Sequence, residues 1–234
     1  MKYLNYKLVL CFCSLAGGVL VSAQSPEELS TLALAELTQR DAMPFIPHSA
    51  QVEEHMGEDA FVYVVEAPEE SVNTYTLLSK NGNPVSEKEA AEFAEERNIP
   101  APGEDGAAST TVDRLMDLID DGKLTFLEQN GDDVLFAFSH VMPFSDDVSV
   151  ALTGRLHYDV SRGYVTSLEL FNEKFFKADS AKIKDFKLTF SFAKVDALDR
   201  ILTTQATTHV EGSAMLFFSF EESCTMTFSD YRKL

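Results

Sequence analysis

The sequence predicts an α+β fold in which a few helices cover one strongly curved antiparallel sheet, an incomplete β-barrel. Two observations predict it. From Leu124 to Tyr231, apolar and polar residues alternate in one short segment after another, with turn residues between them. This alternation is typical of antiparallel strands with one buried and one solvated face. Before Leu124, by contrast, apolar residues recur at helical spacing in two segments, 29–37 and 112–119.

The N-terminus has the pattern of a secretory signal peptide. Lys2 and Lys7 accompany an apolar segment that ends at Leu20, and the small residues Ser22 and Ala23 precede the expected cleavage site. The apolar segment is short for a membrane span, so we expect no transmembrane segment after residues 1–23 are removed. The signal is typical of bacteria, and we expect a soluble protein of the periplasm.

The mature chain, residues 24–234, is expected to form a single domain with two unequal parts. Residues 24–122 are predicted as a helix-rich part with two strands, and they hold 5 basic and 22 acidic residues. Residues 123–234 are predicted as an antiparallel β meander, and they hold 12 basic and 16 acidic residues. The whole chain has a formal net charge of −19. Such a surface repels phosphates, so we expect no nucleic-acid partner.

The helix-rich part begins with a helix at Ser25, because serine caps helices, proline suits the first helical position and acidic residues suit the positive helix end. A short second helix is predicted over Gln51–Met56. Ser86 and Glu89 form a capping box before a third helix. Residues 60–66 and 73–80 are rich in strand-forming residues, and 112–119 is predicted as the last amphipathic helix.

The β meander is predicted from residues that alternate with a period of two. Gly154 lies in the middle of a predicted strand, on its apolar side, where a glycine is expected to help the sheet bend. His157 and His209 fall on polar sides and are expected to face solvent. The predicted strands are 124–129, 134–139, 148–160, 164–171, 186–192, 201–210, 214–220 and 224–228.

Signatures of catalysis and metal binding are missing from the sequence. The five histidines have no metal-ligand spacing, and no nucleophile elbow is present. Cys224 is the single cysteine of the mature chain, which excludes an intramolecular disulfide, and it alternates with Met226 and Phe228 as a buried strand residue would. We therefore expect a protein that is not an enzyme and that uses no cofactor and no metal.

Three segments together resemble exported bacterial proteins of the LolA/LolB-like type, the periplasmic lipoprotein carriers. They are YTLLSKNGNPVSEKEAAEFAEER (75–97), LTGRLHYDVSRGYVTSLEL (152–170) and the ending MTFSDYRKL (226–234). The resemblance implies a half-barrel covered by helices, with an apolar cavity for lipid acyl chains. For the arginine that gates the ligand in the carriers, Arg155 and Arg114 match by charge type alone.

These observations lead to the prediction of a periplasmic binding or carrier protein for an apolar ligand, such as a lipid or a lipoprotein acyl chain. The alternative is a structural or interaction module of the envelope, with a packed core, no small ligand and a protein partner. An integral outer-membrane barrel is a third interpretation, against which the short predicted strands and the acidic first part argue. The predicted lining of the ligand cavity is Phe136, Phe138, Leu152, Leu156, Leu168, Leu170, Phe186, Phe190, Phe192 and Phe218.

Overall fold

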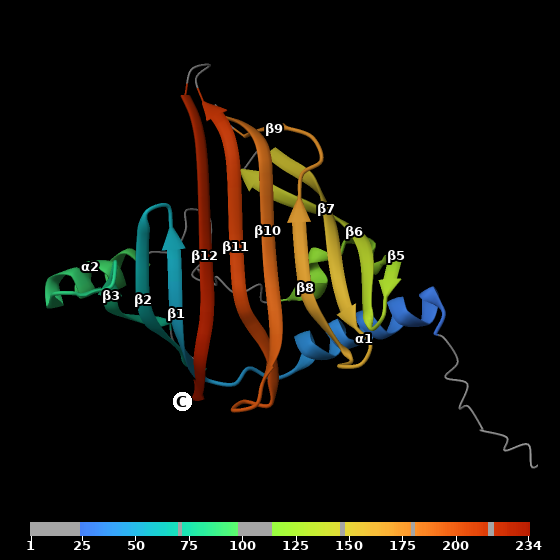
Figure 1. Ribbon diagram of the computed structural model, residues 1–234, viewed down its shortest axis with the longest axis horizontal. Coiled ribbons are helices and arrows are strands. Elements are labelled where there is room, and N and C mark those ends of the chain that lie inside the picture. Colours follow the sequence, from blue (N-terminus) through green and yellow to red (C-terminus); the bar gives the residue numbers. More distant parts are fainter. Residues whose placement is uncertain (1–23, 70–71, 98–113, 146–147, 179–180, 215–217) are drawn as a thin grey trace, which may run out of the picture.

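The computed structural model describes residues 24–69, 72–97, 114–145, 148–178, 181–214 and 218–234. Within these residues, twelve strands form one antiparallel sheet, and two α-helices and two short 3-10 helices accompany it (Figure 1). The strand order along the sheet is β4-β3-β2-β1-β12-β11-β10-β8-β7-β6-β5, and β9 pairs with β10. The sheet is curved and does not close, because β4 and β5 are its two separate edges. The predicted signal peptide lies outside the described residues.

The first helix, α1 (Pro26–Ala42), begins as predicted. The side chain of Ser25 accepts a hydrogen bond from the backbone N–H of Glu28, and the Glu28 carboxylate accepts one from the backbone N–H of Ser25. This reciprocal pair satisfies two of the amide groups that a helix start leaves free. The helix then buries Leu29 and Leu37 against the sheet.

The prediction of a short helix over Gln51–Met56 is wrong, because these residues belong to strand β1 (His48–Met56). The strand lies between β12 and β2 and pairs with both along its length. Its inward side chains include Ala50 and Val52, which are buried, whereas the next inward residue is the charged Glu54. A charged residue at an inward position breaks the alternation by which a strand is normally identified.

Three more strands and a helix complete the first part of the chain. Strands β2 (Asp59–Ala67) and β3 (Thr74–Lys80) match the predicted ones, and the two-residue β4 (Asn83–Pro84) forms the edge. Helix α2 (Glu87–Arg97) starts at the predicted capping box, in which the Glu89 carboxylate accepts bonds from the Ser86 backbone N–H and hydroxyl. These hydrogen bonds lower the pKa of Glu89.

The predicted amphipathic helix over 112–119 is, from Arg114 onward, a pair of 3-10 helices, η1 (Leu115–Leu118) and η2 (Asp120–Gly122). The start of η1 is held by α1, because the Asp41 carboxylate accepts hydrogen bonds from the backbone N–H groups of Leu115, at 3.1 Å, and Met116, at 2.8 Å. Leu115 is buried in the same apolar cluster as α1.

The second part of the chain is an antiparallel succession of strands, as predicted. Three of them are longer than the sequence suggested, because β10, β11 and β12 span 15, 15 and 16 residues. Segments 214–220 and 224–228 were predicted as two strands, but residues 218–220 and 224–228 lie in the one strand β12, and Ala214 ends β11. The bounds are β5 (Thr125–Asn130), β6 (Asp133–Ser145), β7 (Val148–Asp159), β8 (Tyr164–Phe171), β9 (Phe176–Ala178), β10 (Ala181–Val195), β11 (Arg200–Ala214) and β12 (Phe218–Lys233).

One face of the sheet is apolar from one edge strand almost to the other. Residues directly opposite each other in neighbouring strands share a face, so the strand register identifies a row that crosses nine strands. Only one member of this row, Glu54, is charged. The row is Phe126, Phe136, Leu156, Leu168, Phe190, Ala206, Met226, Glu54 and Phe61.

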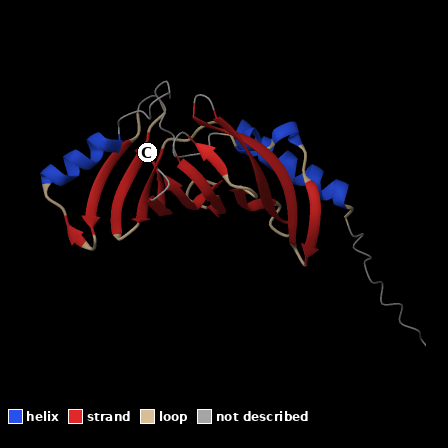
Figure 2. Cartoon of the chain, turned by 90° about the horizontal axis from the view of Figure 1, so that it is seen from above, coloured by secondary structure: helices blue, strands red, loops and turns tan. Residues whose placement is uncertain are grey.

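Both α-helices lie on this apolar face, one toward each end of the sheet (Figure 2). Helix α1 and η1 cover a large cluster built on β6, β7, β8 and β10. Helix α2 covers a smaller cluster, in which Phe93 packs on Val52, Tyr63 and Leu77. Strands β11 and β12 run between the two clusters. We call this apolar face the helix face.

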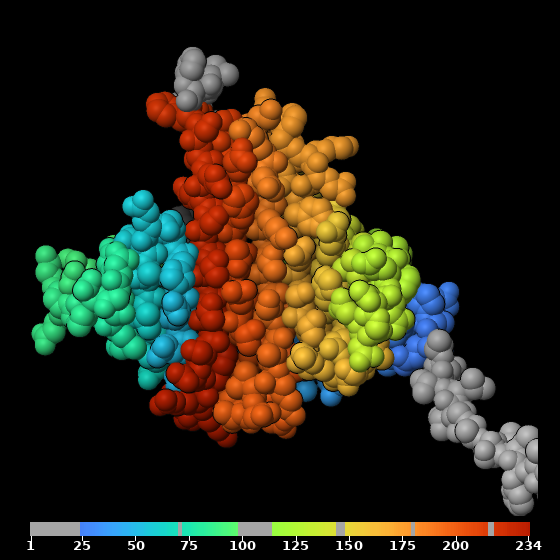
Figure 3. Space-filling view, viewed as in Figure 1, coloured from blue at the N-terminus to red at the C-terminus, as the bar shows by residue number. Residues whose placement is uncertain are grey.

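The opposite face is polar, and no helix of the described chain covers it. Figure 3 looks onto this face, where β12, β11 and β10 form a continuous surface and α1 is almost hidden behind the strands. Its side chains are mostly Thr, Ser, Gln and paired charges. The Thr207 and Thr225 hydroxyls lie 3.4 Å apart, and Lys187 forms an ion pair with Glu169 at 2.9 Å. The alternation seen in the sequence is therefore a real division into a dry and a wet face.

Candidate functional site

The candidate site lies on the helix face, between the two helix-covered clusters. Here the register places Leu188, Thr208, Cys224 and Met56 in one row across β10, β11, β12 and β1. These strands are held at this place because β12, the last strand of the chain, pairs with β1, the first. The site is thus formed by segments from both ends of the described chain.

A groove of about 410 Å³ opens at this position. This volume is in the lower part of the range of roughly 300–1,000 Å³ that is typical of small-molecule sites. Its wall is apolar where Met56, Val210 and Cys224 contribute, and Glu222 adds a carboxylate on the same face, whereas the side chain of Glu221 points to the polar face. The lining residues are Met56, Gly57, Thr208, Val210, Glu221, Glu222, Ser223 and Cys224.

A buried ion pair lies beside the groove. Glu54 has only 3% of its surface exposed, and its carboxylate binds the guanidinium of Arg97, the last residue of α2. Arg97 also donates a hydrogen bond to the Tyr63 hydroxyl at 3.4 Å, and its guanidinium lies 4.4 Å from the Phe93 ring centre. A carboxylate in an apolar face is costly unless it is paired, and this pair fastens α2 to β1.

Cys224 connects the ion pair to the groove. Its thiol lies 3.5 Å from the Glu54 carboxylate, to which it donates a weak hydrogen bond, and the residue also lines the groove. Burial and, after it, the negative charge of Glu54 together raise the pKa of the thiol to about 11. Cys224 is therefore protonated and a poor nucleophile at neutral pH.

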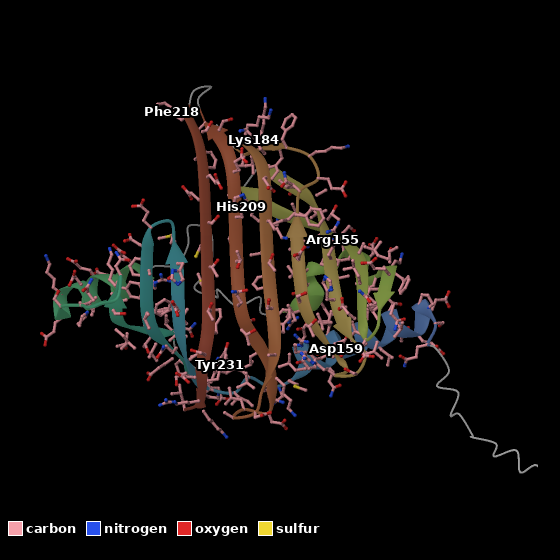
Figure 4. All side chains as sticks on the ribbon, viewed as in Figure 1. Arg155, Asp159, Lys184, His209, Phe218 and Tyr231 are labelled. Atoms are coloured by element: carbon pink, nitrogen blue, oxygen red, sulfur yellow. The ribbon has the colours of Figure 1, made fainter. Side chains whose placement is uncertain are left out.

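The ten residues predicted to line a ligand cavity do not lie in this groove. Nine of them are buried beneath α1 and η1 in the large cluster, where their exposed fractions are 0–7%. Phe218 is different, because it lies at the far end of β12 and 69% of its surface is exposed (Figure 4). The nine buried residues are in contact with other core side chains.

The two arginines that were candidates for a ligand gate, Arg155 and Arg114, lie apart from the groove and from the large apolar cluster. Arg155 is on β7, opposite Ala137 and Glu169 on the polar face, and its guanidinium lies 5.0 Å from the Phe171 ring centre (Figure 4). Arg114 is exposed at the start of η1. Neither side chain lines the groove.

Sequence reasoning missed the groove for a specific reason. Met56 was assigned to a helix, so β1 was absent from the predicted sheet and nothing indicated which strand lies next to β12. The alternation of Cys224 with Met226 and Phe228 correctly placed Cys224 on the apolar face. The pairing of β12 with β1 joins segments about 170 residues apart, as the 3.5 Å contact of Cys224 with Glu54 shows. No local pattern encodes such a pairing.

The histidines have ordinary polar partners. His157 lies 3.0 Å from the Asp133 carboxylate, and His209 lies 2.8 Å from the Ser223 hydroxyl, both on the polar face. Among the residues that the structure describes, no group of three or more His, Cys, Asp and Glu side chains could hold a metal ion.

Neither helix in the described part of the chain is both long and apolar enough to cross a membrane. Comparison of the chain with protein-family models, with curated proteins and with solved structures gave no match.

Proposed function

We propose that this protein is an exported, non-enzymatic binding or carrier protein for an apolar ligand, such as a lipid or a lipoprotein acyl chain. The observation that carries the proposal is the groove between the two helix-covered clusters. The apolar face is covered by helices at both ends and is open between them. A ligand that binds in the open part can bury its apolar surface there while the core stays folded. Concave, mostly apolar sites of this kind are the usual place for small ligands.

The fold agrees with this proposal at the level of architecture. A curved, unclosed sheet with helices on one face is the arrangement expected of a LolA/LolB-like half-barrel, and we propose that this chain is a distant variant of that type. In this variant the ligand binds over β1, β11 and β12 instead of under α1. We further propose the periplasm as its compartment, on the pattern of the first 23 residues.

Mass spectrometry of the native protein purified from its host tests this function. We expect a population of molecules heavier than the polypeptide by the mass of a lipid or fatty acyl ligand, and we expect that mass to be lost on denaturation. A single mass equal to that of the bare mature chain, from cells grown under several conditions, would contradict the proposal.

A second candidate function is an interaction module of the envelope with no small ligand. The observation that favours it is the dense packing of nine predicted lining residues in the core, together with a polar face that no described helix covers. Crosslinking in intact cells separates the two functions. A reproducible protein partner attached through residues of the polar face, with no copurifying lipid, would favour the interaction module.

A further inference from the structure

Two lysines face each other at one end of the sheet. Lys177 on β9 lies directly opposite Lys182 on β10, and both side chains are exposed. Like charges at directly opposite positions of an antiparallel pair are destabilising. Lys174, near the start of β9, is exposed as well, and none of these three lysines forms an ion pair with a described residue. Lys184 on the same strand β10, by contrast, pairs with Glu211 at 2.9 Å.

The composition of the chain makes these unpaired lysines informative. With 38 acidic and 19 basic residues, many acids must lack a cation, but no cation has to lack an acid. The segment 174–182 nevertheless holds three lysines and a single acid, Asp179, which lies outside the described residues. At physiological salt, charges act over about 8 Å, so this local excess of positive charge decides what binds here, in spite of the distant acids.

Exposed aromatic side chains lie at the same end of the sheet. The Lys182 ammonium nitrogen is 3.9 Å from the ring centre of Phe175, and 57% of the surface of Phe175 is exposed. Phe218, at the start of β12, is 69% exposed (Figure 4). It lies opposite Ala214 on β11, which lies opposite Ala181 on β10. The end formed by β9, β10, β11 and β12 thus combines exposed rings with unpaired cations.

The two rings lie on opposite faces of the sheet. Phe218 shares the helix face with Ala181, which packs against the large cluster, whereas Phe175 contacts Lys182, whose side chain is on the polar face. A partner that covered one face would leave the ring on the other face in water. A partner that meets the sheet end-on reaches both rings and the lysines together. Apolar side chains combined with lysines are typical of segments that lie in the interface of a membrane.

We propose that this end of the sheet docks on an anionic lipid surface. We call it the docking end and define it by Lys174, Phe175, Lys177, Lys182 and Phe218. The lysines bind headgroup phosphates, and each lysine near an anionic membrane raises the affinity by about fivefold. The two rings enter the headgroup region and bury apolar surface there. This inference goes beyond the proposed function and does not depend on the groove.

Vesicle flotation with the mature protein tests the docking. Vesicles of phosphatidylcholine with about 30% phosphatidylglycerol have an anionic surface, whereas vesicles of phosphatidylcholine alone have no net charge. At 0.1 M salt we expect binding to the anionic vesicles to be at least about 10-fold tighter, and 0.5 M salt should remove most of the difference. Inorganic phosphate at the same ionic strength should not displace the protein, because a free ion offers no apolar layer to the rings.

A double variant assigns the binding to the opposed lysines. Lys177→Gln with Lys182→Gln should weaken binding to the anionic vesicles by about 10-fold or more, because two cations leave the surface. The matched control is Arg232→Gln with Lys233→Gln, which removes the same charge from the other end of β12. It should change the affinity by less than about 2-fold. Circular dichroism shows whether each variant is folded, and the vesicle series on the unaltered chain does not depend on either variant.

Tryptophan substitutions report where the rings lie, because the chain contains no tryptophan. In Phe175→Trp and in Phe218→Trp, the emission should move to shorter wavelength when anionic vesicles are added, and lipids with brominated acyl chains should quench it. Phe45→Trp is the control. Phe45 is 52% exposed and lies shortly before β1, whose first residue pairs with Lys233 at the opposite end of β12. Its emission should not change.

Several results would overturn the inference. They are equal binding to the two kinds of vesicle, no binding to either, displacement by inorganic phosphate, and full affinity in the double lysine variant. An emission of Phe218→Trp that moves with protein concentration in the absence of vesicles would also overturn it, because a second copy of the chain would then cover this end. None of these results bears on the native mass spectrum that tests the proposed function.

Discussion

Glu54 is the residue on which the organisation of the helix face depends. It is the single charged member of a row of otherwise apolar residues that crosses nine strands, and it is almost completely buried. Arg97 compensates it from the end of α2, and Cys224 donates to it from the next strand. The same residue explains the error in the prediction of β1, because a buried charge is not expected at an inward strand position.

Removal of Arg97 should therefore be costly. Arg97→Met leaves the Glu54 carboxylate buried without its cation, and we expect the free energy of unfolding to fall by about 3–5 kcal/mol. The double variant Glu54→Met with Arg97→Met should be more stable than Arg97→Met alone, because no unpaired charge remains. Urea unfolding followed by circular dichroism measures both. A loss below about 1 kcal/mol in the single variant would show that the ion pair is solvated.

The thiol of Cys224 should react slowly and with a shifted pH dependence. Its pKa of about 11 lies two units above the ordinary value of 9.0, so the thiolate fraction at pH 8 is about 100-fold lower than in an unfolded chain. The rate of alkylation by iodoacetamide should rise about tenfold for each pH unit between pH 7 and 10. The urea-denatured protein is the control, and its rate should level off near pH 9. A folded protein whose rate also levels off near pH 9 would contradict the assigned environment.

At the scale of elements, the sequence predicts well what local patterns determine. The cap predicted at Ser25 and the capping box predicted at Ser86 are both present, because a cap needs only residues within one helical turn. The strands of the second part are found with shifted ends, since alternation sets the face but not the length of a strand. The region 112–119 has helical spacing, yet from Arg114 it forms 3-10 turns that depend on Asp41. This tertiary contact could not be read from the sequence.

The attachment of α1 to the sheet is a further feature that only the structure reveals. Val165 pairs with Tyr158 on β7, next to a register shift, whereas the pairing of β8 with β10 ends at Ser167. The backbone groups of Val165 therefore have no partner on β10. Glu36 and Arg40, paired with each other, supply the partners. The Val165 N–H donates to Glu36 at 3.1 Å, and Arg40 donates to the Val165 carbonyl at 3.1 Å. Burial lowers the pKa of Arg40, although the neighbouring Glu36 carboxylate favours the charged guanidinium.

Gly154 has a packing role that the sequence suggested only in part. A Cβ atom at this position would lie 2.2 Å from the ring of Phe138, the residue opposite it on β6. The glycine thus leaves the space that the aromatic ring occupies. Gly154→Ala should lower the free energy of unfolding by about 1–3 kcal/mol through overpacking.

A second substitution identifies the cause of that loss. Gly154→Ala combined with Phe138→Leu should recover part of the stability relative to Gly154→Ala alone, because the smaller side chain vacates the space of the new methyl group. Phe138→Leu alone is the matched control. If Gly154→Ala raised the stability, as the substitution does where space is free, the close approach of the ring would be disproved.

At the scale of the whole molecule, one sheet joins two separately covered clusters. The acidic first part of the chain, residues 24–122, does not form a separate layer over the sheet of the second part. Its strands β1 to β4 extend that sheet beyond β12. The two helix-covered clusters lie on either side of β11 and β12, and the groove opens in this region. The alternating second part predicted a sheltered apolar face correctly. The place of the groove depends on the pairing of the first strand with the last and could not be predicted.

Mapping of a bound alkyl chain by NMR tests the central claim most directly. The mature protein, with labelled methyl groups of Met, Val and Leu, is titrated with decanol, an uncharged alcohol with a ten-carbon chain. We predict saturable shifts at Met56 and Val210, which line the groove, and much smaller shifts at Leu156 and Leu168, which lie in the packed core. The largest shifts at Leu156 and Leu168, or no saturable shift at Met56 and Val210, would contradict the account.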